Sequence, residues 1–169
     1  MTDSAATPPA KGHPKGLYVL FGAEMFERLC YYGMRALLVL YLTKALMKGD
    51  TEAFGIYGAY TALVYAAPVA GGKIADSILG YRRAVIFGGL LMAIGEFMIL
   101  GGNEFFLFAG MAVIIIGNGY FKANISTIVG RLYEDGDPRR DSGFTIFYMG
   151  INLGAFLATA PIFGVGPLG

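Results

Sequence analysis

The chain has 169 residues, of which 56% are hydrophobic and 15% charged, and its mean hydropathy is +0.58. In soluble domains roughly a quarter of all residues are charged, so this composition favours an integral membrane protein. The net charge of +1 gives no electrostatic basis for nucleic-acid binding, and the single cysteine excludes a disulfide framework.

Residues 1–16 are polar and contain prolines, which predicts a disordered cytoplasmic tail, with the sole histidine, His13, solvated there, and no signal peptide. Five apolar segments follow, each of at least about 19 residues, enough for a helix to cross a ~30 Å hydrocarbon core. Outer-membrane strands would show alternating polarity, which is absent. We therefore expect an all-α integral membrane protein with spans at 17–43, 54–72, 84–102, 105–130 and 143–165.

Lysine and arginine are distributed unevenly between the connections. Two lie on one side of the predicted spans, Lys44 and Lys48, and eight on the other. By the positive-inside rule, the N-terminus is cytoplasmic in a multi-pass protein of the inner (plasma) membrane. The eight are Lys11, Lys15, Lys73, Arg82, Arg83, Arg131, Arg139 and Arg140.

The first span carries four ionisable side chains, each costing on the order of 2.5–3.5 kcal/mol at mid-membrane. Together with Tyr31 they lie within about 100° of arc on a helix of ~100° per residue. The four are Glu24, Glu27, Arg28 and Arg35. Such a stripe faces a protein interior or a watery cavity. It predicts a functional site, with a Glu–Arg network that only holds helices together as the alternative.

Lys122 lies near the middle of the fourth span and shares a helix face with Asn118 and Ser126. A buried lysine stays charged only beside a carboxylate or an anionic ligand, and Glu24 and Glu27 are the candidates. These groups predict a titratable cluster in which protonation of a carboxylate frees a cation for an anionic substrate group. A purely structural ion pair is the alternative.

The second connection, residues 71–83, reads GGKIADSILGYRR. Its glycine pair permits close helix packing, and its acidic residue lies at a helix end, where it can pair with a cation or a helix N-terminus. The spacing resembles the loop signature between the second and third helices of the major facilitator superfamily. The resemblance implies a gating role for Gly72, Asp76, Arg82 and Arg83.

Three further motifs carry a narrower resemblance. Residues 24–34 read EMFERLCYYGM, residues 147–154 read FYMGINLG, and Lys122 lies in the fourth span. They resemble the ExxER motif, the fifth-helix FYxxINxG signature and the fourth-helix lysine of the proton-dependent oligopeptide transporter family. The resemblance covers residues 17–165 and is closest to bacterial members.

The resemblance implies a symporter that imports di- and tripeptides with protons by alternating access, without other cofactors or a metal. That family folds as twelve or more helices in two halves, so this chain is expected to be an N-terminal part whose second half is missing. The implied proton-coupling residues are Glu24, Glu27, Arg28 and Lys122. The implied peptide-binding residues are Arg35, Lys122, Tyr31, Tyr32, Tyr65 and Asn152.

Some roles stay open. Packing between helices is the alternative for the tyrosines, and an interhelical hydrogen bond for Asn152. No histidine lies in the second span, so coupling is expected to depend on carboxylates; Glu96 either pairs with another helix or lies near the outer interface. The alternative cargo is another small solute, such as nitrate or a drug. An intramembrane enzyme or a receptor is disfavoured, since the spans hold no Ser–His dyad, no paired metal-binding histidines and no pair of catalytic aspartates. The sequence contains no GxxxxGK(S/T) loop, so ATP-driven transport is not indicated.

Overall fold

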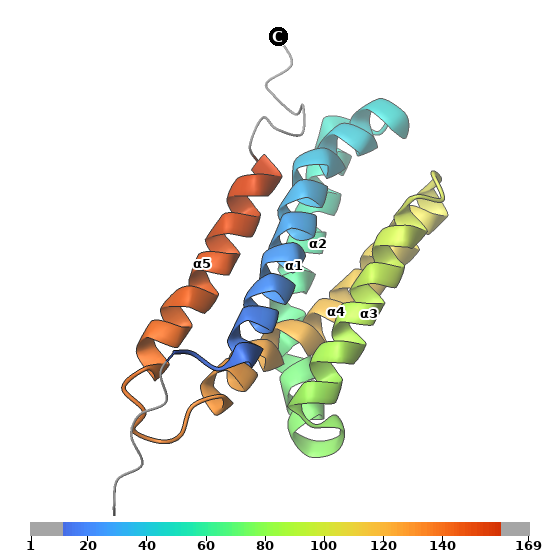
Figure 1. Ribbon diagram of the computed structural model, residues 1–169. Coiled ribbons are helices and arrows are strands. Elements are labelled where there is room, and N and C mark those ends of the chain that lie inside the picture. The colour runs from blue at the N-terminus through green and yellow to red at the C-terminus, as the bar shows by residue number, and fades with distance from the viewer. Residues whose placement is uncertain (1–11, 160–169) are drawn as a thin grey trace, which may run out of the picture.

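The computed structural model describes residues 12–159, and within that range every regular element is a helix, as the all-α prediction required (Figure 1). Each predicted span overlaps one α-helix, but the first also includes residues 41–43 of a π-helical turn and the third runs past the helix end at Ile99. Residues 1–11 of the predicted tail and 160–165 of the last predicted span lie outside the described residues. The elements are α1 (Lys15–Leu40), η1 (Tyr41–Ala45), α2 (Asp50–Ile74), η2 (Ala75–Leu79), α3 (Tyr81–Ile99), α4 (Glu104–Arg131) and α5 (Arg140–Thr159).

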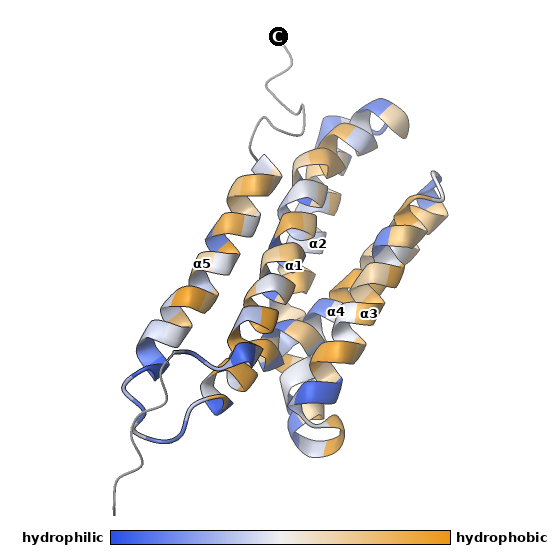
Figure 2. Cartoon of the chain, in the orientation of Figure 1, coloured by the Kyte–Doolittle hydropathy of each residue, from blue (hydrophilic) through white to orange (hydrophobic). Residues whose placement is uncertain are grey.

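Three helical stretches are long and apolar enough to cross a membrane: Asp50–Leu79, Glu104–Arg131 and Arg140–Thr159. Helices α1 and α3 are also long, but each contains more charged residues than such a stretch usually has. Figure 2 shows hydrophobic residues along the helices and hydrophilic ones concentrated in the connection between α4 and α5. Five membrane spans therefore stay a prediction.

Local sequence explains where the helices begin and end. The single turns of π-helix, η1 and η2, continue α1 and α2. Gly80 has a φ of 75°, a left-handed conformation that glycine adopts without strain, and it separates η2 from α3. Asn103 caps α4, because its side-chain oxygen accepts a hydrogen bond of 2.9 Å from the backbone N–H of Phe106.

The helices pack mainly in pairs. Helix α4 packs along α3 and along α2, and α1 packs along α5 (Figure 1). Helices α1 and α4 contact each other at few places. Long side chains can therefore meet in the space between α1 and α4, and the charged stripe of α1 faces this space.

Glycines bring the α4 backbone close to its neighbours. A side chain at Gly71 on α2 would collide with the backbone oxygen of Gly119, and one at Gly88 on α3 would lie 2.5 Å from that of Gly117. Small residues permit such close approach between membrane helices, where van der Waals packing replaces the hydrophobic effect as the driving force. The glycines at these crossings thus serve helix packing.

Replacement of Gly71 by valine is expected to lower the stability of the protein, because the α2 and α4 backbones must separate. Overpacking of this kind costs about 1–3 kcal/mol. Gly58→Val on the same helix is the matched control, since nothing lies within 4 Å of its would-be side chain. Thermal unfolding in detergent measures both variants, and equal losses in the two would contradict the packing explanation.

The segment before α1 contradicts part of the tail prediction. His13 Nδ1 lies 2.8 Å from the Tyr133 hydroxyl, and the Arg139 guanidinium donates a 2.6 Å hydrogen bond to the backbone oxygen of Gly12. The solvated state expected for His13, and a disordered tail reaching residue 16, are therefore wrong for residues 12–16. These residues instead pack against the connection between α4 and α5, and α1 begins at Lys15.

Asp137 in that connection accepts hydrogen bonds from the Arg139 side chain and backbone, and these bonds lower its pKa to about 2. Because the folded-state pKa lies below the ordinary value of 3.8, Asp137 stabilises the fold above pH 3.8, and this contribution is lost as the pH falls towards 2. Asp137→Asn is thus expected to lower the melting temperature at neutral pH, with the difference shrinking below about pH 4. Asp135→Asn serves as the control, and a difference independent of pH would contradict this account.

Candidate functional site

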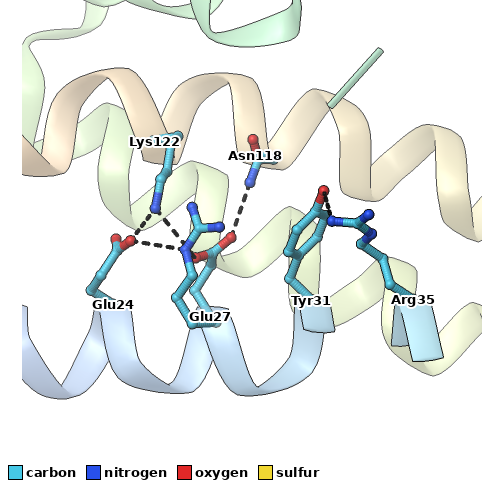
Figure 3. A network of polar contacts seen from close by, with 7 residues as sticks. Glu24, Glu27, Tyr31, Arg35, Asn118 and Lys122 are labelled. Atoms are coloured by element: carbon cyan, nitrogen blue, oxygen red, sulfur yellow. Dashed lines mark hydrogen bonds and ion pairs between the residues drawn. The ribbon is translucent and has the colours of Figure 1, made fainter. Parts of the chain in front are cut away.

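Four charged side chains from α1 and α4 form one cluster between these helices (Figure 3). The Lys122 ammonium of α4 donates to Glu24 Oε1 and lies 3.6 Å from Glu27 Oε2. Arg28 Nε lies 3.2 Å from Glu24 Oε1 and 2.9 Å from Glu27 Oε2. Each carboxylate therefore contacts both cations, and the cluster of two acids and two bases is electrically neutral.

Burial makes this neutrality necessary. Glu24 is fully buried, Glu27 and Arg28 are also buried, and the Lys122 side chain is 26% exposed. Removing charges from water costs several kcal/mol per ion, which only close partners offset. A group that changes its charge here must therefore change the contacts of its partners. The second carboxylate oxygen of Glu24 has no hydrogen-bond partner within residues 12–159, which leaves it open to a proton.

Asn118 extends the cluster along α4. Its side-chain amide donates a 3.1 Å hydrogen bond to Glu27 Oε1. The sequence placed Asn118 on the polar face of Lys122 but gave it no role in the site. Ser126, on the same predicted face, lines a separate cavity near the connection between α4 and α5.

Arg35 lies about two helical turns further along α1 and does not meet Lys122 (Figure 3). Its Nε donates a 2.9 Å hydrogen bond to the hydroxyl of Tyr57 on α2, and a second guanidinium nitrogen also contacts that hydroxyl. The guanidinium lies 5.3 Å from the ring centre of Tyr31 and 5.9 Å from that of Tyr32. These distances allow cation–π attraction. Lys122 and Arg35, which the sequence analysis assigned together to the peptide carboxylate, thus belong to two separate centres: the charged cluster around Lys122 and the arginine–tyrosine centre around Arg35.

Tyr31 and Tyr32 connect the two centres. Arg28 lies 5.5 Å from the ring centre of Tyr31 and 5.9 Å from that of Tyr32, so both rings contact Arg28 on one side and Arg35 on the other. The Tyr31 hydroxyl accepts a 3.5 Å hydrogen bond from Arg35. A displacement of either guanidinium would therefore affect the same two rings.

The remaining predicted binding residues lie at the edge of this arrangement. Tyr65 forms a side-chain hydrogen bond with Tyr31 and is 64% exposed. Asn152 is exposed on the side of α5 away from the buried glycines, Gly150 and Gly154, that pack against α1. The structure therefore places Tyr65 beside the arginine–tyrosine centre and does not bring Asn152 to it.

The predicted loop motif is only partly assembled. Asp76 accepts a hydrogen bond from the Tyr81 hydroxyl, which raises the pKa of Tyr81. The Arg131 guanidinium lies 4.1 Å from the ring centre of Tyr81. A side chain at Gly72 would lie 3.3 Å from Ala123, so Gly72 belongs to the close crossing of α2 and α4. Arg82 and Arg83 are exposed.

Tyr57, Tyr81 and Arg131 are contact residues that the sequence analysis missed. Tyr57 has no motif around it, and only the packing of α2 beside α1 reveals its contact with Arg35. No group of three or more histidine, cysteine or acidic side chains within residues 12–159 could hold a metal ion.

Comparison with known proteins shows which transporters the chain resembles. The POT family matches residues 82–164. The chain is 44% identical over 164 residues to the uncharacterised transporter YclF of Bacillus subtilis, and 39% identical over 160 residues to dipeptide and tripeptide permease A of Chromobacterium violaceum. These alignments cover 94% of this chain but 33% and 32% of the relatives. The chain thus spans about a third of the length of the curated relatives that it matches.

Solved structures agree with the sequence relatives. A peptide transporter POT in complex with sulfate superposes with a TM-score of 0.86 at 47% identity, over 92% of this chain and 33% of that one. A POT family transporter in complex with a thioalcohol-conjugated peptide gives 0.85 at 46% identity, over 90% and 32%. The chain is therefore similar to POT family peptide transporters and corresponds to about the N-terminal third of their length.

Proposed function

We propose that this chain is part of a longer secondary transporter, not an enzyme, that imports di- and tripeptides together with protons. The neutral cluster of Glu24, Glu27, Arg28 and Lys122 is the observation that supports this most directly. Relatives named dipeptide and tripeptide permease and a relative solved with a conjugated peptide support the choice of cargo.

The cluster offers a physical basis for coupling. Protonation of Glu27 removes its charge, so Arg28 and Lys122 then share a single carboxylate, that of Glu24. One cation is left without a full counter-charge, and a substrate carboxylate can supply it. Because the cluster tolerates only a balanced set of charges, proton and substrate arrive and leave together.

The peptide would lie between the two cationic centres. Lys122 and Arg35 are assigned to its C-terminal carboxylate, and Arg35 presents a planar guanidinium suited to bidentate contact. Tyr31, Tyr32 and Tyr65 supply apolar surface with polar tips for varied side chains. The remaining part of the transporter completes the site. The N-terminus is assigned to the cytoplasm and the protein to the inner (plasma) membrane.

Uptake of labelled dialanine by proteoliposomes that contain the complete transporter tests this function. We expect accumulation with an inward proton gradient and none when a protonophore collapses it. Unlabelled dipeptides should compete and nitrate should not. Gradient-driven uptake that nitrate suppresses and dipeptides do not would replace the peptide assignment with transport of another solute.

A further inference from the structure

Glu96 on α3 is not part of the cluster described above and faces two cavities. The first, of about 300 Å³, lies between α1, α3 and α4. The second, of about 610 Å³, lies beside the end of α3 and the beginning of α4. Glu96 and Cys30 line both cavities, so they lie where the two spaces meet.

The first cavity connects Glu96 to the charged cluster. Glu27 and its hydrogen-bond donor Asn118 line this cavity together with Glu96, so both carboxyl groups face one space. The rest of its lining is apolar apart from Cys30 and Tyr31, which leaves few polar partners for either carboxyl. The apolar lining includes Phe26, Met92, Ile114 and Phe121.

The second cavity leads from Glu96 towards the ends of the helices. Leu100 and Gly102, in the turn between α3 and α4, line it together with Tyr41, the first residue of η1. Under the proposed orientation, this turn faces the outside of the cell. The two cavities therefore follow each other from the outer ends of the helices, past Glu96, to Glu27.

No hydrogen bond or ion pair holds Glu96 within residues 12–159, although the side chain is half-buried. No cation lines either cavity in that range. Ionisable groups without a partner inside a membrane are rare and mark ion or proton pathways. The titratable groups that line these cavities together with Glu96 are Glu27, Cys30 and Tyr31 from α1 and Tyr41 from η1. Tyr60 from α2 interacts electrostatically with Glu96 but lines neither cavity, and α4 contributes no titratable group to the linings.

We infer that Glu96 passes protons between the outer side and Glu27, an inference that rests on the proposed proton-coupled function. The carboxyl O–H bond of Glu96 breaks, its proton crosses water in the first cavity, and a new O–H bond forms on the Glu27 carboxylate. Glu96 then takes up another proton through the second cavity, and no electrons are exchanged. At ~30 Å³ per water, the volume of about 300 Å³ gives room for several molecules beside the polar groups of Glu27, Asn118 and Glu96.

The variant Glu96→Gln of the complete transporter tests this inference, because glutamine keeps the shape and hydrogen-bonding groups but carries no transferable proton. We expect gradient-driven dipeptide uptake and substrate-driven proton entry to fall by at least about tenfold, since transfer by a positioned side chain contributes about 10² or more in rate. Counterflow exchange at equal pH should persist, and Glu96→Asp should recover part of the driven rate. Glu134→Gln, at an exposed carboxylate, is the matched control.

The outcomes separate the inference from the function on which it rests. Wild-type protein without gradient-driven uptake overturns the proposed function. Wild-type uptake with an unchanged rate and pH profile in Glu96→Gln overturns only the role of Glu96. Loss of both driven uptake and counterflow in Glu96→Gln also overturns that role, because it indicates a structural contribution.

Cys30 supplies an independent measurement that needs no change at Glu96. Its exposed thiol lines both cavities. In a complete transporter with Cys30 as the only cysteine, a small membrane-impermeant methanethiosulfonate added from the outside is expected to modify it. Absence of modification from the outside, with modification after solubilisation, overturns the outer route.

Discussion

Replacement of Lys122 by alanine is expected to abolish proton-driven peptide uptake by the complete transporter. The change leaves two buried carboxylates facing Arg28 alone, so the cluster acquires a net charge of −1. Removing one partner of a buried pair costs about 3–5 kcal/mol, and the solvent around Lys122 places its loss near the lower value. If Glu24 or Glu27 keeps a proton, the cluster is neutral again, but that carboxyl group can then no longer exchange protons during transport. Dialanine uptake and thermal unfolding measure the two effects.

Charge balance provides the control for this prediction. The double variant Lys122→Ala, Glu24→Gln retains one acid, Glu27, and one base, Arg28, and is neutral again. We expect it to recover stability but not driven uptake, because the exchangeable cation is absent. Lys73→Ala, at an exposed lysine near the end of α2, should behave as wild type. Full uptake by the double variant would contradict the assignment of Lys122 to coupling.

The contact between the charged stripe and Lys122 could be anticipated from the sequence. Glu24, Arg28 and Arg35 recur at helical spacing in an otherwise apolar segment, and such a stripe cannot face lipid. A buried Lys122 needs a carboxylate partner to stay charged, and Glu24 and Glu27 in the ExxER motif of the first span are the candidates. Charge burial is so unfavourable that it leaves few arrangements, and the structure indeed brings Lys122 to both carboxylates.

The partners of Arg35 could not be anticipated in the same way. Its hydrogen bonds to Tyr57 depend on how α2 lies beside α1. The sequence contains several tyrosines, and nothing in it distinguishes Tyr57 from the others as the partner of Arg35. The direction of Asn152 is likewise set by the glycine face through which α5 packs on α1. Neutral polar side chains bury at modest cost, so a sequence restricts their contacts far less than it restricts those of charges.

The close approach of α2 and α4 at their glycines was also only partly predictable from the sequence. The sequence indicated that the pair Gly71 and Gly72 permits close helix packing. It did not identify α4 as the partner or Gly119 as the residue in contact. Close approach requires small residues on both helices at matching heights, and those heights depend on tilt and shift, which local sequence does not determine.

Glu27→Gln is expected to separate transport from its driving force. Glutamine keeps the hydrogen bond with Asn118 but cannot gain or lose a proton, so gradient-driven uptake is lost. Counterflow exchange needs no net proton movement and should survive. Arg35→Ala removes a cation assigned to the substrate carboxylate, and it should reduce counterflow as well as driven uptake. Both assays on both variants, in the same proteoliposomes, measure this difference.

The comparison is informative because the two residues lie on one helix, about two turns apart. Arg35 contacts Tyr31 and Tyr32 directly, whereas Glu27 is linked to these rings through Arg28. A general loss of folding would lower both assays in both variants, whereas a coupling role lowers one assay in Glu27→Gln alone. Adding Lys122→Ala to Glu27→Gln removes the ammonium along with the proton acceptor. Gradient-driven accumulation at the wild-type level in that double variant would refute the assignment of coupling to Glu27 and Lys122, because neither the proton acceptor nor the cation that it releases would remain.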